Sequence, residues 1–227
     1  MATQTKIKTK ASDMFVLAIL AYLLTLIAPV LGGFVSQNNA VAILVIRVIC
    51  IAAWVFGSWG LVISAKNECA FNVIDKNNKP TTLQWILTAA VTVAFVAYCI
   101  IDSIPDFNAA AGTLNTAMDY VMLVTYYIMN AFQAIAITLI VVFAQKAFEK
   151  VFGLGKFIPW GGIALGLCWA VASLLGSTDL IIPSLENILV PALWSLAYGI
   201  VFGIIYLVSG KKALYALPFI AVAFVLM

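Results

Sequence analysis

The chain has 227 residues, of which 65% are hydrophobic and only 9% are charged, and its formal net charge is +3. A composition this apolar excludes a soluble globular domain, and the apolar runs reach the roughly 20 residues that span a bilayer. The lysines are dispersed over several loops, so we expect no nucleic-acid partner. Histidine is absent. This excludes histidine-ligated metal and a histidine-dependent nucleophile or proton relay, and we expect neither a metal nor a cofactor.

The apolar runs predict an all-α fold, a polytopic membrane helix bundle of about seven transmembrane helices in a single domain covering residues 1–227. The last run is short for a span, which leaves open whether it crosses the membrane fully. The expected spans lie near residues 14–34, 41–64, 83–105, 117–146, 157–177, 187–208 and 213–227.

The lysines alternate with the predicted spans. The loops at 35–40, 106–116 and 178–186 contain no lysine, whereas the N-terminal segment and the other loops contain all of them. Because positive residues stay on the cytoplasmic side, we expect a cytoplasmic N-terminus and a multi-pass protein of the cell membrane, surrounded by the lipid bilayer. The lysines are Lys6, Lys8, Lys10, Lys66, Lys76, Lys79, Lys146, Lys150, Lys156, Lys211 and Lys212.

The run 117–148 carries a regular set of polar residues. Asp119, Tyr126, Asn130 and Gln133 follow one another at offsets of seven, four and three, so they share one face of a helix. An unpaired amide or carboxylate in hydrocarbon costs several kcal/mol, so this face should point into protein or into a water-filled cavity. We therefore predict that this polar stripe faces a ligand or a partner.

Arg47 is a charge inside the second predicted span, about two turns from its outer end by helical rise. Such a charge either reaches the membrane interface or pairs with an acid. Asp119 and Glu186 are the expected partners, and contact with an anionic ligand is the alternative.

Two pairs of glycines have the spacing of close helix contacts. Gly162 and Gly166 form one GxxxG pair, and Gly199 and Gly203 form another. Small residues at this spacing let membrane helices approach closely, so we predict that both pairs serve helix packing.

The C-terminal part has a recognisable cadence. The segment LAYGIVFGIIYLVSGKKALYALPFIAVAF at 196–224 and the stretch Glu149 to Gly153 resemble the CPBP (Abi) family, the CAAX-protease and bacteriocin-processing intramembrane proteins. In that family a glycine-rich helix leads through a Ser/Thr-Gly turn to a final helix, and a similar turn follows the catalytic helix. The resemblance covers roughly residues 120–227 and rests on the spacing of residues along these segments.

The catalytic signature of that family is absent from the matching positions. The family has a paired-glutamate EExxxR motif, an FxxxH motif on the next helix and a histidine near the end. A proteolytic water needs a carboxylate base or a metal, and Gln133 supplies neither. The resemblance thus implies a pseudoenzyme without catalytic residues. The family's catalytic positions would fall near Phe132 and Gln133, Ile137, Trp169 to Ser173, and Phe219.

Three functions remain open from the sequence. The first is a non-catalytic member of that family acting as a scaffold, a partner-binding protein of the membrane or an immunity-type protein. The second is a small-solute transporter or a membrane-embedded solute-binding subunit, which amide and aromatic groups near the midplane would suit. The third is an enzyme of another class, with Asp119 and Asp102 or Asp106 as an acidic cluster.

Overall fold

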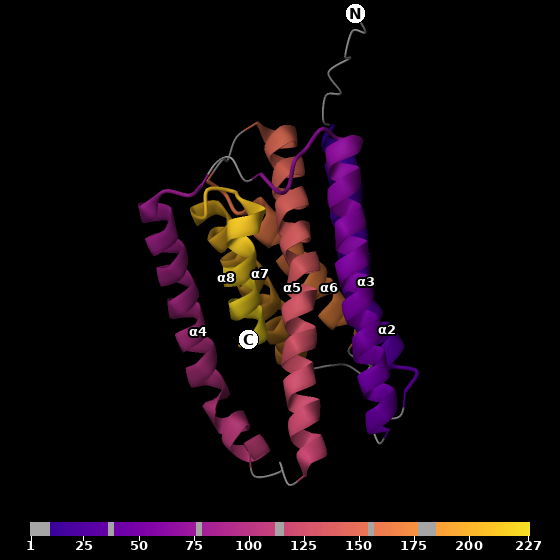
Figure 1. The fold of residues 1–227 in the computed structure, drawn as a ribbon. Helices are drawn as coiled ribbons and strands as arrows, with labels where there is room; N and C mark the ends of the chain where they lie inside the picture. Colours follow the sequence, from indigo (N-terminus) through magenta and orange to yellow (C-terminus); the bar gives the residue numbers. More distant parts are fainter. Residues whose placement is uncertain (1–9, 36–38, 76–78, 112–115, 154–156, 177–184) are drawn as a thin grey trace, which may run out of the picture.

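The computed structural model describes residues 10–35, 39–75, 79–111, 116–153, 157–176 and 185–227, with the side chains of 102–111, 174–176 and 185–188 excepted. The described part is all α-helical (Figure 1). Within it, five segments are long and apolar enough to cross a membrane, and two shorter apolar helices accompany them. The chain is therefore a helical membrane protein. The helices are α1 (Ala11–Thr25), α2 (Ile27–Gly32), α3 (Ala40–Asn67), α4 (Thr82–Ala111), α5 (Ala117–Phe152), α6 (Trp160–Gly176), α7 (Leu185–Val208) and α8 (Ala213–Val225).

The bundle has two distinct ends. The start of α1, the connection from α3 to α4, the end of α5 and the α7–α8 turn lie together at the top of Figure 1. We call this the lysine end, because Lys10, Lys66, Lys146, Lys211 and Lys212 lie there. The start of α5 and the end of α2 lie at the opposite end.

Helix α5 is the centre of the bundle, but only in its second half. Every residue from Ala136 to Gln145 is buried, whereas Asn130 is the single buried residue between Ala117 and Gln133. Around α5 pack α1, α3, α6 and α8, while α4 packs on α7 and α8 instead. The chain leaves α5 at Gly153, which has a φ of +60° and therefore adopts the left-handed conformation that glycine accommodates best.

The first predicted span, 14–34, is broken into α1 and α2 at Leu26. Pro29 has no N–H to donate to the Thr25 carbonyl four residues earlier, so a regular helix cannot continue through this point. Neighbouring helices supply the missing donors. The Trp54 indole donates to the Leu24 carbonyl at 2.7 Å, and the Gln133 amide donates to the Thr25 carbonyl at 3.4 Å.

Two other helices extend beyond the predicted spans. The run expected at 83–105 continues as helix to Ala111, and the run expected at 117–146 continues to Phe152. Helix α4 begins with a reciprocal cap, in which the Gln84 side chain accepts from the Thr81 N–H at 2.9 Å and Thr81 Oγ1 accepts from the Gln84 N–H at 3.3 Å.

Candidate functional site: the polar residues at the lysine end

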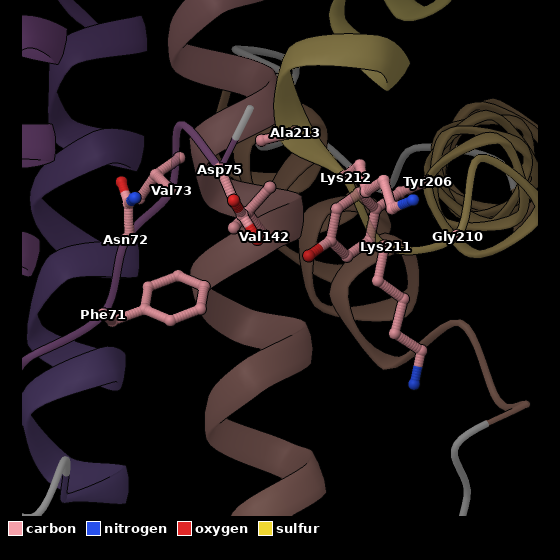
Figure 2. A pocket seen from close by; sticks show the side chains of 10 residues that line it. All are labelled: Phe71, Asn72, Val73, Asp75, Val142, Tyr206, Gly210, Lys211, Lys212 and Ala213. Carbon is pink, nitrogen blue, oxygen red and sulfur yellow. The ribbon is translucent and has the colours of Figure 1, made fainter. Parts of the chain in front are cut away.

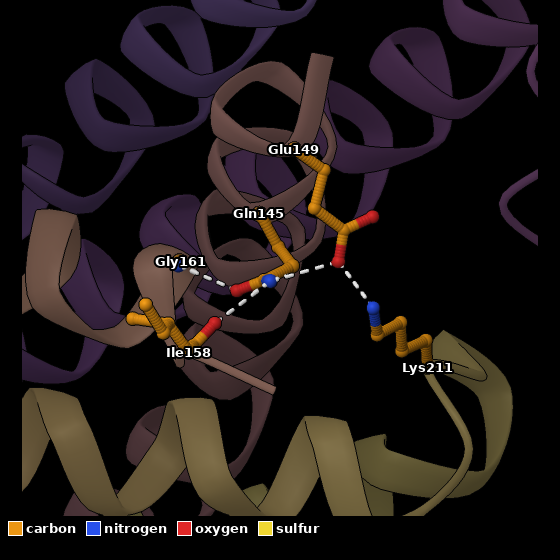
Figure 3. Close-up of polar contacts among 5 residues, drawn as sticks. All are labelled: Gln145, Glu149, Ile158, Gly161 and Lys211. Atoms are coloured by element: carbon orange, nitrogen blue, oxygen red, sulfur yellow. Dashed lines mark hydrogen bonds and ion pairs between the residues drawn. The ribbon is translucent and has the colours of Figure 1, made fainter. Parts of the chain in front are cut away.

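A buried amide joins the end of α5 to the start of α6. The Gln145 side chain is 1% exposed. Its Nε2 donates to Glu149 Oε1 at 2.9 Å and to the Ile158 carbonyl at 3.0 Å, and its Oε1 accepts from the Gly161 N–H at 2.9 Å (Figure 3). Because the N–H groups in the first turn of a helix lack partners within the helix, Gln145 acts as the cap of α6. Both amide protons and the amide oxygen are satisfied.

Glu149 extends this cluster to the α7–α8 turn. Its Oε1 also accepts from the Lys211 ammonium, and this ion pair joins the end of α5 to the α7–α8 turn (Figure 3). Lys211 follows Gly210, and both have positive φ, +60° and +77° respectively. The Lys211 N–H donates to the Tyr206 carbonyl and the Gly210 N–H to the Leu207 carbonyl, both at 3.0 Å, which ends α7 as a Schellman turn.

A polar cavity of about 220 Å³ lies beside this cluster (Figure 2). We call it the turn cavity, because the α7–α8 turn forms one wall. The opposite wall is the 71–75 segment, which is fixed to the bundle by the buried Val73 and by Phe71, whose N–H donates to the Ala65 carbonyl at 2.9 Å. The lining residues are Phe71, Asn72, Val73, Asp75, Val142, Tyr206, Gly210, Lys211, Lys212 and Ala213.

The four residues of the predicted polar stripe have different surroundings in the structure. Asp119 Oδ2 accepts from the Thr116 N–H at 2.8 Å, and Thr116 Oγ1 accepts from the Asp119 N–H at 3.3 Å, so Asp119 belongs to a capping box that begins α5. Tyr126 is 46% exposed, while Asn130 is 8% exposed. Gln133 donates to the carbonyl left open at the α1–α2 break.

Arg47 does not pair with Asp119, one of its two predicted partners. The Arg47 guanidinium instead donates to the Met122 carbonyl and to Thr125 Oγ1, and it lies 5.8 Å from the centre of the Tyr126 ring. Asp119 is held in the helix cap described above. The side chain of Glu186, the other predicted partner, lies outside the described residues, as do those of Asp102 and Asp106.

The glycines of the two GxxxG pairs lie at the contact between α6 and α7. A Cβ atom added to Gly162 would lie 2.2 Å from the Gly199 carbonyl oxygen, and one added to Gly203 would lie 2.8 Å from the Gly162 Cα. On Gly166 it would lie 2.7 Å from the Leu196 Cα. The two backbones therefore approach so closely that no larger side chain fits.

The positions at which the resemblance would place catalytic residues make packing contacts and one local hydrogen bond. Ile137 is fully buried, Trp169 packs on Phe202 with ring centres 5.9 Å apart, and the Ser173 hydroxyl donates to the Trp169 carbonyl at 3.0 Å. Phe219 contacts Trp85 with ring centres 5.5 Å apart. These positions do not line the turn cavity.

Gln145 and Tyr206 were not predicted from the sequence as site residues, and Glu149 was predicted only as part of a turn. One signal was available, because Gln145 and Glu149 are four residues apart and share a helix face. The partners of this pair, Lys211 and Gly161, come from distant parts of the chain, and only the packing of α6 and α7 against α5 brings them together.

No family model, no curated protein and no solved structure matches the chain.

Proposed function

We propose that the protein is a non-catalytic, multi-pass protein of the cell membrane that acts as a scaffold by binding another membrane protein. In this proposal the lysine end faces the cytoplasm, because every lysine lies in the N-terminal segment, in alternate connections between helices, or at the helix ends beside those connections. The proposal includes the resemblance to the CPBP family, as a member without the catalytic pair, arginine and histidines. Two acids support the non-catalytic part of the proposal, because both carboxylates already have structural roles. Glu149 is bound by Lys211 and Gln145, and Asp119 caps a helix.

The observation that carries the scaffold proposal is the environment of Arg47. Its guanidinium lies seven residues into α3 and is fixed against α5 by the Met122 carbonyl, the Thr125 hydroxyl and the Tyr126 ring. No acid among the residues with described side chains forms an ion pair with it. A guanidinium has five N–H donors. Within a membrane, a guanidinium that is held in place by its own protein without a negatively charged partner is energetically costly.

The surface around Arg47 suits a protein partner. Tyr126, beside Arg47, is 46% exposed, and the neighbouring Tyr127 packs edge-on against it with ring centres 5.9 Å apart. Aromatic residues and arginine are enriched at protein interfaces, and a tyrosine hydroxyl exposed to lipid tails gains from a hydrogen-bonding neighbour. The partner should therefore present a membrane helix that carries a carboxylate at the depth of Arg47.

The scaffold proposal is tested by purifying the tagged protein from its native membranes in mild detergent. We expect a stoichiometric membrane protein to co-purify with the wild type and to be lost with Arg47→Gln, which removes the charge but keeps a polar side chain. Lys66→Gln, which removes an exposed charge at the other end of α3, should retain the partner. A monodisperse wild-type protein that purifies without a partner would contradict the proposal.

A second function, a membrane-embedded solute-binding protein or small-solute transporter, draws on the turn cavity. This cavity is partly enclosed by side chains of both charges and lies between three elements of the bundle. A bound small molecule identified by mass spectrometry in the purified protein, with no protein partner, would favour this function over the scaffold.

A further inference from the structure

We propose that the turn cavity binds a singly charged phosphate group, supplied by a phospholipid headgroup or by a soluble phosphate ester. This site lies at the lysine end, away from the proposed partner contact at Arg47, and does not depend on the scaffold function. Four features of the described residues carry the proposal: a helix N-terminus without a side-chain cap, the hydroxyl of a buried tyrosine that makes no hydrogen bond to a described residue, a lysine without an acid, and the size of the cavity.

The start of α8 offers backbone donors to the cavity. Lys212 is the N-cap residue of α8 and makes no side-chain cap hydrogen bond. The N–H groups of Tyr215 and Ala216 donate to the Lys212 carbonyl, whereas no backbone acceptor among the described residues is found for those of Ala213 and Leu214. Backbone N–H groups and the positive end of the helix dipole make such a terminus favourable for phosphate. Lys212 and Ala213 both line the cavity.

The Tyr206 hydroxyl points independently to a ligand. Tyr206 is 4% exposed, and in Figure 2 its hydroxyl points across the cavity toward Val142 and Asp75. The structure gives this hydroxyl no hydrogen-bond partner among the residues it describes, although the buried hydroxyls of Thr138 and Ser209 each donate to a nearby carbonyl at 2.8 Å. A phosphate oxygen in the cavity would accept the proton of this hydroxyl, for which no acceptor is found among the described residues.

The charges around the cavity limit what it can bind. The Lys211 ammonium is bound by Glu149, while Lys212 has no acid partner in the described part of the chain. Lys212 therefore supplies the positive charge that a phosphate requires. Asp75 lines the same cavity, and its carboxylate repels a second negative charge. A phosphate with one charge, such as a phosphodiester, fits this balance better than a multiply charged ligand.

The size and position of the cavity agree with a headgroup. Its volume of about 220 Å³ is below the roughly 300–1,000 Å³ of sites for drug-sized ligands. The cavity is formed at the turn between two apolar helices, which places it at the depth where phospholipid headgroups lie. Basic pockets between membrane helices at this depth are suited to anionic headgroups.

The experiment uses the full chain in two arms, with matched variants. In the first arm, the protein is extracted from vesicles of phosphatidylcholine and phosphatidylglycerol, and retained lipid is counted by native mass spectrometry. In the second arm, delipidated protein is titrated with glycerophosphoglycerol, a soluble phosphodiester with one negative charge, and its thermal stability is followed. The test variants are Tyr206→Phe, which removes one hydroxyl, and Lys212→Gln. The controls are Tyr215→Phe and Lys66→Gln, which alter the same residue types outside the cavity.

We expect the ligand affinity to fall about threefold to fivefold in Tyr206→Phe and about tenfold in Lys212→Gln, with no change in either control. Loss of retained phosphatidylglycerol in the test variants would support a lipid source, and loss of the stabilisation by glycerophosphoglycerol would support a soluble source. Test variants that behave like the wild type in both arms would overturn the proposal. Tyr206→Phe keeps the shape of the core, so this variant should fold. It therefore tests the proposal even if Lys212→Gln fails to fold.

Discussion

Gln145 uses both amide protons and its amide oxygen in hydrogen bonds, and this makes its loss costly. Replacement by leucine would leave the buried Gly161 N–H without its partner, whereas the Ile158 carbonyl would keep the Trp160 N–H. We expect Gln145→Leu to lower the free energy of unfolding by about 1–3 kcal/mol, the cost of one unsatisfied group. Equilibrium unfolding of the purified protein in mixed micelles, with increasing SDS, measures this change.

Gln133→Leu is the matched control for Gln145→Leu. The Gln133 amide makes one long hydrogen bond, 3.4 Å to the Thr25 carbonyl, so its loss should cost about 1 kcal/mol or less. Equal losses of unfolding free energy from the two substitutions would contradict the prediction that the Gln145 side chain stabilises the fold more than the Gln133 side chain does.

Cys69 gives a pH-dependent test of the lysine end. It lies after the end of α3 and is 3% exposed. Burial raises the pKa of its thiol, the negative charges of Asp13 and Glu68 raise the pKa further, and Lys150 opposes them. Because only the thiolate reacts with iodoacetamide, alkylation of Cys69 should be slower than that of a reference thiol at pH 7.5 and should still increase above pH 9.

The raised pKa of the Cys69 thiol also determines the direction in which stability changes with pH. A thiol with a raised folded-state pKa keeps its proton longer in the folded protein, so its contribution to stability is present at low pH and is lost as the pH rises through that pKa. Asp13→Asn should lower the pKa of the Cys69 thiol and speed its alkylation. An alkylation rate that levels off by pH 8 in the wild type would contradict this account.

At the scale of the helices, the contact between α6 and α7 depends on glycine. A Cβ atom on Gly199 would lie 2.4 Å from the Gly166 backbone nitrogen and 2.5 Å from the Gly162 carbonyl oxygen. We expect Gly199→Ala to force the two helices apart and to reduce the yield of folded protein, because backbone atoms cannot move aside cheaply. The measurement is the monodisperse fraction in size-exclusion chromatography.

Gly60→Ala, in α3, is the control for Gly199→Ala. A Cβ atom at Gly60 meets nothing within 4 Å, so alanine should stabilise α3 by about 0.5–1 kcal/mol through its helix propensity. Equal loss of folded protein from both substitutions would show that the α6–α7 contact is not specific to glycine.

The sequence predicted some helices better than others for physical reasons. The GxxxG spacing is local to each helix, so both glycine pairs could be recognised without knowing the fold. The break at Leu26 was missed, although Pro29 was visible, because a proline either kinks or ends a helix according to whether neighbours satisfy the open carbonyls. Here those neighbours are Trp54 and Gln133, from two other helices.

The polar residues were harder to assign from sequence than the spans. Their spacing correctly placed Asp119, Tyr126, Asn130 and Gln133 on one helix, but the role of each depends on its surroundings in the fold. Asp119 caps its own helix, whereas Gln133 donates to the α1–α2 break. The turn cavity combines residues 71–75 with α7 and α8, which no local pattern joins.

At the scale of the whole molecule, the orientation in the membrane is testable with single cysteines. Phe34 is 82% exposed after α2, and Lys66 is exposed at the lysine end. We expect a membrane-impermeant maleimide to label Phe34→Cys in intact cells and to label Lys66→Cys only after lysis, because in the proposed orientation the lysine end faces the cytoplasm. The opposite pattern would reverse the orientation.

We propose that Arg47 and Tyr126 contact a partner within the membrane, and photo-crosslinking from position 126 tests this contact. A benzophenone amino acid replaces Tyr126, and a second protein carries it at Trp59, a 58% exposed residue of α3. We predict that position 126 yields one discrete protein adduct in native membranes, that Arg47→Gln abolishes it, and that position 59 does not yield it. Lipid adducts alone at both positions, or an adduct that persists in Arg47→Gln, would contradict the claim.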